Sequence, residues 1–230
     1  MGLKESGLRG SLRSVSAGVG IPDSEDAQIW VVSDDLELLD GETVSTWDDR
    51  SDNGFDLTGS STFIEDDLNG FPAVETESGD SDELDVSFDT ITEPWTFFFV
   101  CRVMDTGLSD DSTLYTSEDE DFNPNLTVET DDGLRLRDTE TGGDHNAEYN
   151  IWMVQIDSDK DVTIRQNGET VLNDSTDEVE GWDGFRIWMR RNTDLRSIEL
   201  ILYPSERDDI DSHESYLSDK YDVALDGAQS

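Results

Sequence analysis

Short apolar segments separated by turn-forming residues follow one another from Gln28 to Tyr203. The segments are four to nine residues long, and several alternate between apolar and polar positions. Such lengths and alternation are typical of β-strands, because helices in globular proteins are longer and repeat every 3.6 residues. The predicted strands are Ile29–Val32, Ala73–Thr76, Trp95–Val103, Ser112–Ser117, Leu126–Thr130, Leu134–Arg137, Tyr149–Ile156, Val162–Arg165, Glu169–Leu172, Phe185–Arg190 and Ile198–Tyr203.

Asn-Gly and Asp-Gly pairs lie between these segments and predict tight turns, because these residues tolerate the left-handed backbone conformation. The pairs are Asn53-Gly54, Asn69-Gly70, Asp132-Gly133 and Asn167-Gly168. Residues 162–171 alternate cleanly around the last pair, which predicts a β-hairpin. Many short strands at roughly ten-residue spacing favour an all-β fold, an antiparallel jelly-roll sandwich.

The two ends of the chain depart from the strand pattern. Ile210, Leu217 and Tyr221 recur at helical spacing, which predicts one amphipathic helix over residues 205–221. Residues 1–24 are rich in Gly, Ser and Leu and do not alternate. The predicted organisation is an extended N-terminal docking arm (1–24), a β-sandwich (25–204), and a C-terminal helix and tail packed on the sandwich (205–230).

The charge of the chain is extreme. Fifty-seven acidic side chains oppose 15 basic ones, which gives a formal charge of −42. Asp outnumbers Glu by 37 to 20, and Arg outnumbers Lys by 12 to 3. Nucleic-acid binding and anionic membranes are excluded as targets, because both need clustered basic residues. An Asp-rich, Lys-poor surface indicates a protein that works in multimolar K+ or Na+, where such charges are screened.

The N-terminal arm is the exception to this acidity. Residues 1–20 carry three basic side chains against Glu5 alone, so their charge is +2 and that of the remainder is −44. We expect a weakly basic, leucine-punctuated peptide of this kind to dock on an acidic partner, with a free terminus as the alternative. The predicted docking residues are Leu3, Lys4, Leu8, Arg9, Leu12 and Arg13.

The number of cysteines and the lengths of the apolar segments indicate the compartment in which the protein is made. Cys101 is the single cysteine, so no disulfide forms within the chain, and its place in an apolar strand predicts a buried thiol. No segment reaches 18 apolar residues, and the N-terminus has no apolar signal core, so neither membrane insertion nor Sec export is expected. Assembly in a cytoplasm is therefore predicted, whatever the final location.

Seven short motifs follow one another between residues 28 and 222: Ile29–Leu36, Asp40-Gly41, Val44–Gly54, Asn69–Val74, Gln166–Glu169, Glu199–Tyr203 and Tyr216–Tyr221. Taken in order, they resemble laminin G-like domains of the concanavalin A-like lectin/glucanase superfamily. This resemblance implies a lectin-like sandwich, a fold that hosts lectins, hydrolases and spacers alike.

The arm carries a separate resemblance. Residues 2–13 are similar to a leader on structural proteins of tailed viruses that infect haloarchaea. This resemblance implies that the arm attaches the chain to a viral particle and that the sandwich is presented outward.

Catalysis is not expected from this sequence. Glycoside hydrolysis requires two carboxylates about 5–9 Å apart, and the Glu-x-Asp-x-x-Glu signature of the glucanases does not occur. The two histidines, His145 and His213, lie near no nucleophile motif and are interpreted as surface residues. Phosphate-binding and dinucleotide-binding glycine motifs are also missing from the sequence. The chain is therefore interpreted as a non-enzyme that needs no cofactor.

A metal site is one hypothesis for the acidic turn after Thr46. Asp48, Asp49 and Asp52 cluster there and form a candidate site for calcium or another hard cation, with a solvated turn as the alternative. Residues 157–161 begin like an EF-hand loop but lack its glycine and terminal glutamate, so a strand-connecting turn is predicted there.

A glycan site is the second hypothesis for the same region. Trp47 and Trp182 lie beside turn residues, and Asp49 and Asn53 could supply polar contacts to a sugar. The favoured interpretation places both tryptophans in the core or at its rim. The remaining tryptophans lie on predicted strands and are assigned to the core: Trp30, Trp95, Trp152 and Trp188.

The leading functional hypothesis is a virion surface protein of a halophilic virus, either a turret, a spike or a tail-adhesion subunit. Its predicted partners are other virion proteins through residues 1–24, further copies in a ring or spike, and a host glycan or S-layer. It would assemble in the host cytoplasm and be extracellular in the mature particle. The alternative is a secreted or cell-surface carbohydrate-binding module, and a glycoside hydrolase is the least favoured.

Overall fold

The computed structural model describes residues 25–77, 83–104, 112–117, 126–128, 134–136, 139–140, 147–175, 181–188 and 194–226. The predicted docking arm and its six candidate residues lie outside the described residues. So do His145 and the Asp132-Gly133 turn.

Within these residues, β-strands dominate. The strands are β1 (Ile29–Val32), β2 (Thr43–Trp47), β3 (Leu57–Leu68), β4 (Phe71–Thr76), β5 (Glu83–Ile91), β6 (Trp95–Val103), β7 (Ser112–Thr116), β8 (Leu126–Val128), β9 (Leu134–Leu136), β10 (Thr139–Glu140), β11 (Asn150–Ile156), β12 (Asp161–Gln166), β13 (Glu169–Ser175), β14 (Trp182–Trp188) and β15 (Leu195–Tyr203). The helices are the 3-10 turn η1 (Ser33–Asp35) and α1 (Ile210–Tyr221). The described helices include none that is long and apolar enough to span a membrane.

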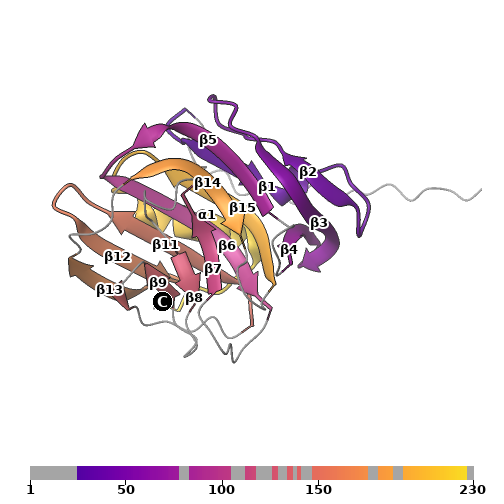
Figure 1. The fold of residues 1–230 in the computed structure, drawn as a ribbon. Helices are drawn as coiled ribbons and strands as arrows, with labels where there is room; N and C mark the ends of the chain where they lie inside the picture. Colours follow the sequence, from indigo (N-terminus) through magenta and orange to yellow (C-terminus); the bar gives the residue numbers. More distant parts are fainter. Residues whose placement is uncertain are drawn as a thin grey trace, which may run out of the picture.

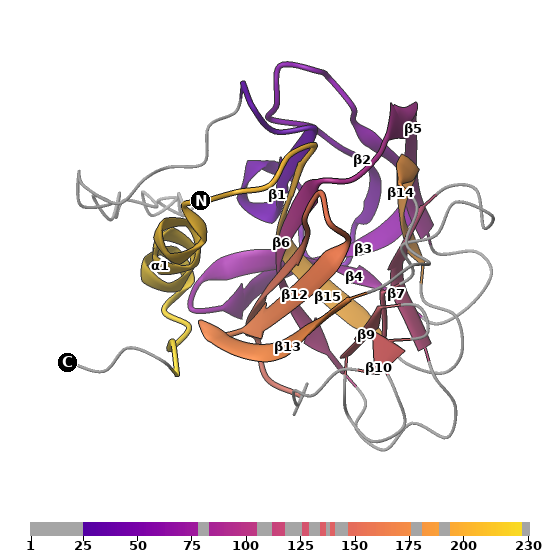
Figure 2. The same ribbon diagram turned by 90° about the vertical axis from the view of Figure 1, so that its left-hand side faces the viewer.

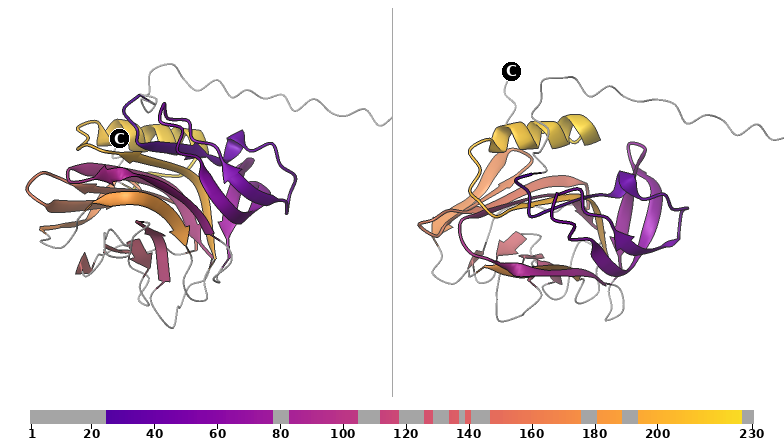
Figure 3. Two further views of the ribbon diagram at one scale, coloured as in Figure 1. Left: turned by 45° about the horizontal axis from the view of Figure 1, so that its top comes forward. Right: turned by 90° about the horizontal axis from the view of Figure 1, so that it is seen from above.

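The strands form one antiparallel sheet that curls on itself into two layers (Figures 1 and 3). Along the sheet the order is β10-β9-β8-β7-β14-β5-β3-β4-β15-β6-β11-β12-β13, with β1 beside β15 and β2 beside β3. Side chains of β6 meet those of β14 across the core, as in the edge-on contact of Trp95 with Trp182 at 5.5 Å between ring centroids. The predicted jelly-roll sandwich is confirmed.

Strand β6 explains how a continuous apolar run fits a β-sheet. Its odd-numbered residues, such as Phe97 and Phe99, point between the two layers, whereas Phe98 and Val100 point outward. All four side chains are buried, because α1 covers the outer face of this layer (Figure 2). A strand that is buried on both faces has no polar side, so its sequence does not alternate. Cys101 is buried in the same strand, as predicted.

The C-terminal helix begins later than predicted. Residues 205–221 were expected to be helical, but α1 starts at Ile210. The preceding segment is held in a non-helical path, because Thr96 donates to the carbonyl of Ser205 (2.9 Å) and Gln155 donates to that of Arg207 (3.1 Å). Tyr216, Leu217 and Tyr221 then pack onto the sheet, which anchors the helix there.

Two of the predicted turns are two-residue hairpins. Asn69 and Gly70 have φ values of 51° and 88°, and Asn167 and Gly168 have values of 49° and 85°. Both positive values match the turn type that Asn-Gly favours. Asn53-Gly54 also lies at a turn, with a φ of 69° at Gly54, but this turn belongs to a longer loop, because β2 ends at residue 47 and β3 begins at residue 57.

Candidate functional site

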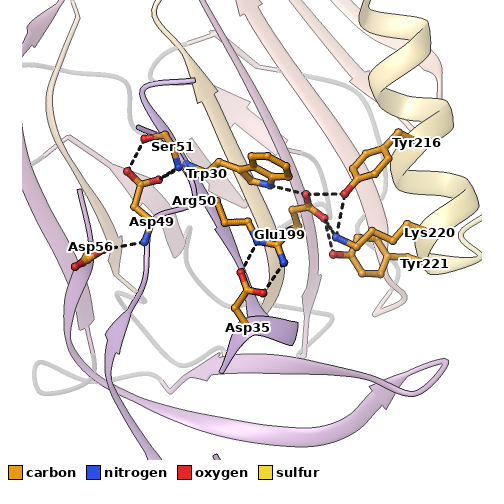
Figure 4. A network of polar contacts seen from close by, with 10 residues as sticks. All are labelled: Trp30, Asp35, Asp49, Arg50, Ser51, Asp56, Glu199, Tyr216, Lys220 and Tyr221. Carbon is orange, nitrogen blue, oxygen red and sulfur yellow. Dashed lines mark hydrogen bonds and ion pairs between the residues drawn. The ribbon is translucent and has the colours of Figure 1, made fainter. Parts of the chain in front are cut away.

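The predicted acidic turn proves to be a structural joint. The carboxylate of Asp49 accepts hydrogen bonds from the backbone N–H of Trp30 (2.8 Å), Ser51 (2.9 Å) and Phe55 (2.9 Å), and from the Ser51 hydroxyl (2.5 Å). Asp56 in turn accepts from the Asp49 N–H (2.9 Å; Figure 4). Both carboxylate oxygens of Asp49 are thus occupied by the protein. Asp49 therefore fastens the turn to β1 and does not face a ligand.

The neighbouring residues support the same correction. Asn53 donates to the carbonyls of Ala27 (2.9 Å) and Gln28 (3.2 Å), so its amide also holds the turn in place. Asp48 and Asp52 are exposed. The described residues contain no group of three or more His, Cys, Asp or Glu that could hold a metal ion. The predicted metal cluster of Asp48, Asp49 and Asp52 is therefore not formed.

The two candidate platform tryptophans are both core residues. Trp47 and Trp182 are fully buried, and Trp182 packs against Trp95, Phe97 and Phe185. Neither can stack on a sugar, so the hypothesis of an aromatic platform at these positions is wrong and the favoured core position is confirmed. Proximity to a turn in the sequence does not determine which face of a strand a side chain occupies. The core assignment is confirmed for Trp30, Trp95 and Trp152, and the side chain of Trp188 is outside the description.

His213 is another correction, since it lies in the interior. Its ring stacks on Phe98 at 4.8 Å between centroids, and Nε2 lies 2.9 Å from the Tyr203 hydroxyl. Nδ1 lies 3.1 Å from the Asp209 carbonyl oxygen. Burial lowers the pKa of His213, which favours the neutral ring. His213 thus fixes the first turn of α1 to the sheet and is not paired with a nucleophile.

Glu199 is a fully buried carboxylate that accepts hydrogen bonds from several side chains. It was not among the candidate residues predicted from the sequence. It lies between β15 and α1, with 0% of its surface exposed. Its oxygens accept from Trp30 Nε1 (2.7 Å), Lys220 Nζ (2.7 Å) and the Tyr221 hydroxyl (2.5 Å), and the Tyr216 hydroxyl lies at 3.4 Å (Figure 4). Burial first, and Glu199 second, raise the pKa of Tyr216 and Tyr221.

This network defines the chemistry that Glu199 can perform. Its lone pairs are directed at four donors from β1 and α1, so no free oxygen is left to take a proton from a substrate. The network therefore stabilises the docked helix. A single acidic residue within the apolar run Ile198–Tyr203 was the sequence signal for a buried, paired carboxylate.

A second buried carboxylate, Glu214, is only partly satisfied. Its side chain is 1% exposed, and Oε2 accepts from Arg165 at 2.8 Å. Oε1 has no hydrogen-bond partner. Burial raises the pKa of Glu214 to about 7, against the opposing charge of Arg165, while Asp211 raises it further. The carboxyl group therefore favours the protonated state in the folded chain more than in the unfolded one.

We expect the substitution Glu214→Gln to remove a pH-dependent loss of stability. A carboxyl group whose pKa is raised from 4.5 to about 7 on folding binds its proton more tightly in the folded state. Its contribution is complete below pH 4.5 and is lost as the pH rises through about 7. Urea unfolding should show the variant gaining about 1–3 kcal/mol on the wild type between about pH 5 and pH 8. A difference in unfolding free energy between the two proteins that does not change with pH would contradict this prediction. His213 is present in both proteins, so its contribution to the pH dependence cancels from the difference.

A surface pocket lies between the segment that follows β1 and the β3–β4 hairpin. Its volume is about 240 Å3. The apolar lining residues Leu36, Leu38, Phe63 and Pro72 are buried or half-buried. The rest of the lining consists of Gly70 and four acidic residues, Asp34, Glu37, Glu65 and Asp66. We call this the acidic pocket. The sequence analysis did not predict it.

The wall of the acidic pocket is held by backbone hydrogen bonds. The segment 36–42 follows β3, because the Gly41 N–H donates to the Phe63 carbonyl (2.8 Å) and the Phe63 N–H donates to that of Glu42 (2.8 Å). On the other side, the Ser33 hydroxyl donates to the Pro72 carbonyl (2.5 Å). The pocket is therefore preformed. Its chemistry suits a ligand with both an aliphatic part and a cation, because it offers apolar carbon and acceptor oxygens.

The geometry defines the class of fold, an antiparallel β-sandwich, and solved domains of several toxins have a similar structure. The chain is similar to the binding domain of Paraclostridial Mosquitocidal Protein 1 (TM-score 0.66, 14% identity, 85% of this chain and 53% of that one). It is also similar to the binding domain of botulinum neurotoxin DC in complex with rat synaptotagmin II (0.65, 13%, 86% and 52%). A third is the ligand-binding domain of botulinum neurotoxin serotype D in complex with N-acetylneuraminic acid (0.62, 10%, 86% and 51%).

These likenesses show the fold alone, because the identities are 10–14%. The chain spans about half the length of the solved domains that it matches. No family model and no curated protein matches the sequence. The shared sandwich is thus established, whereas the laminin G-like and viral resemblances stay predictions.

Proposed function

We propose that this chain is a non-catalytic attachment subunit that presents a lectin-like sandwich to a surface glycan. The observation that carries the proposal is the fold, which 85–86% of the chain shares with receptor-binding and ligand-binding domains. The occupied state of Glu199 supports a non-enzymatic role, because a carboxylate saturated by protein donors is a poor general acid or base.

The setting of this subunit is the surface of a virion in concentrated salt. The acidic, Lys-poor composition supports a protein that works in concentrated salt. The resemblance of residues 2–13 to leaders of haloarchaeal viral proteins supports attachment to a viral particle. In this proposal residues 1–24 attach the chain to other virion proteins, and identical copies form a turret, spike or tail-adhesion ring. The subunit assembles in the host cytoplasm and is extracellular in the mature particle.

The charge of the chain restricts the class of glycan. A surface with a formal charge of −42 repels sialylated or sulfated sugars at short range, even where salt screens longer distances. The described residues also expose no large aromatic side chain, Leu39 being the exposed large hydrophobic residue among them. We therefore propose a neutral glycan, or the glycan of an S-layer, bound through hydroxyl groups.

A glycan array in multimolar KCl tests the proposal. The folded chain should bind neutral hexose or N-acetylhexosamine glycans, and the free sugar should displace it. Sialylated glycans on the same array serve as the matched comparison and should bind about tenfold less or worse, a difference of about 1.4 kcal/mol. Binding to no glycan, or a preference for sialylated ones, would contradict the proposed recognition role.

The second candidate is a secreted or cell-surface carbohydrate-binding module that belongs to no particle. It shares the same fold and the same glycan test. The two candidates differ in where the chain is found: recovery of the chain from purified particles of a halophilic virus supports the first, and its absence from them supports the second.

A further inference from the structure

We propose that the acidic pocket of one copy binds the N-terminal arm of a second copy, so that the subunits assemble arm to pocket. This inference rests on the proposed function in one respect, the role of residues 1–24 as an attachment element. It names the acidic partner of that arm as this same chain.

The first argument is the charge of the pocket. Four carboxylates line it, and its lining contains no basic side chain. Asp34, Glu37 and Asp66 are exposed, so their charge is available to a ligand at the surface. Elsewhere in the described chain, arginines pair with such acids: Arg50 binds Asp35, and Arg196 bridges two carboxylates. Beside the exposed carboxylates of Asp34, Glu37 and Asp66, the lining of the pocket therefore offers no basic side chain.

The second argument is the apolar surface at the same place. Leu36 and Leu38 are half-buried in the lining, and the adjoining Leu39 is 68% exposed. Leu39 is the exposed large hydrophobic residue among those that the structure describes. Its backbone is fixed, because its N–H donates to the Glu42 side chain (2.8 Å). Covering an exposed leucine beside the acidic pocket with another apolar side chain is favourable, because apolar surface is removed from water.

The third argument is the composition of the arm. The 24 residues that precede the described chain contain three dipeptides in which a leucine stands next to a base: Leu3-Lys4, Leu8-Arg9 and Leu12-Arg13. Each dipeptide offers an aliphatic side chain next to a cationic one, which is the combination that the chemistry of the pocket suits. Residues 1–20 of the arm carry a charge of +2, against −44 for residues 21–230. The charge of this part of the arm is therefore opposite to that of the pocket.

Concentrated salt permits this contact between two strongly acidic bodies. At 1 M ionic strength the Debye length is about 3 Å, so repulsion between the sandwiches is screened, whereas ion pairs in contact and buried leucines persist. Extended, 24 residues reach about 80 Å, which is ample to cross to a neighbour. An arm bound in its own pocket would join no two subunits, whereas an arm bound in a neighbour's pocket would link the copies of the proposed ring, so we commit to the second copy.

Disulfide trapping between two full-length variants tests the inference. One chain carries Leu8→Cys and the other Leu39→Cys, with different affinity tags, and the two are mixed under mild oxidation in multimolar KCl. The native Cys101 does not interfere, because it is buried and its pKa is raised to about 12. The matched control replaces Leu39→Cys by Asp159→Cys, a change in the exposed turn after β11.

The expected result is a mixed disulfide dimer that forms on the order of a hundredfold faster than with the control chain, because docking raises the effective concentration of the thiols. Reversal of the pocket charge by Asp34→Lys and Glu37→Lys should reduce this rate to that of the control. Two results overturn the inference: mixed dimers no faster than the control, or a Leu8→Cys/Leu39→Cys double variant that closes only within one chain. Neither result affects the glycan test, so the two proposals fail separately.

Discussion

Replacing Glu199 by glutamine is expected to lower the free energy of unfolding by about 3–5 kcal/mol. The carboxylate is fully buried and accepts from Trp30, Lys220 and Tyr221. A neutral amide leaves the Lys220 ammonium without its counter-charge and turns an N–H group towards donors. Removal of one partner of a buried ion pair costs more than the pair contributes, because the remaining charge stays desolvated.

Urea unfolding at constant, multimolar KCl measures this loss. The matched control is Glu206→Gln, an exposed glutamate just before α1 that should change the stability by about 0.5 kcal/mol or less. Hydrogen exchange in α1 should rise selectively in the Glu199 variant, because the network joins this helix to β1 and β15. Equal stabilities of the two variants would show that the network does not hold the helix.

Dialysis from multimolar KCl into dilute buffer is expected to unfold the domain. The charge of −42 is spread along the whole chain, so the acidic side chains repel one another once the Debye length rises from about 3 Å at 1 M to about 30 Å at 0.01 M. The loss of unfolding free energy should be comparable with the total unfolding free energy of a typical folded domain, ~5–15 kcal/mol.

Circular dichroism and thermal melting across a KCl series measure this effect, with refolding on return to high salt as the check of reversibility. Sucrose at low ionic strength is the control, because it favours compact states without screening charge. A melting temperature that stays constant down to dilute buffer would contradict the interpretation of the acidic surface. Full recovery by sucrose alone would show that screening is not the cause.

The strands that the sequence predicted well are those whose apolar pattern is strong. β1 and β6 have the predicted bounds, since both consist almost entirely of apolar residues. The strands β2, β3, β5 and the two-residue β10 were not predicted. Most of the exposed and half-exposed positions of β3 and β5 are polar, and β3 has a register irregularity between Ile64 and Leu68 that breaks the two-residue period. Few apolar residues and an interrupted period thus conceal these strands in the sequence pattern.

The candidate site was harder to predict, for a different reason. The pattern around Asp49 correctly marked a turn, but the backbone N–H groups that occupy its carboxylate come partly from Trp30, on another strand. Trp47 and Trp182 were candidates for a binding surface because of their neighbours in sequence, and the structure confirms the core position that was favoured for both. A polar residue reveals its role only when its partners are known.

The sequence by itself determined the class of fold, the acidic surface and the basic character of residues 1–20, because strand periodicity and charge are local properties of the chain. Tertiary structure alone decided which partners the buried acids have and where a pocket forms. Trp30 and Glu199 are 169 residues apart, and Asp67 and Arg196 are 129 apart, yet each pair is in contact. Such contacts follow from how the sheet curls and where α1 docks, and no local pattern of residues specifies either.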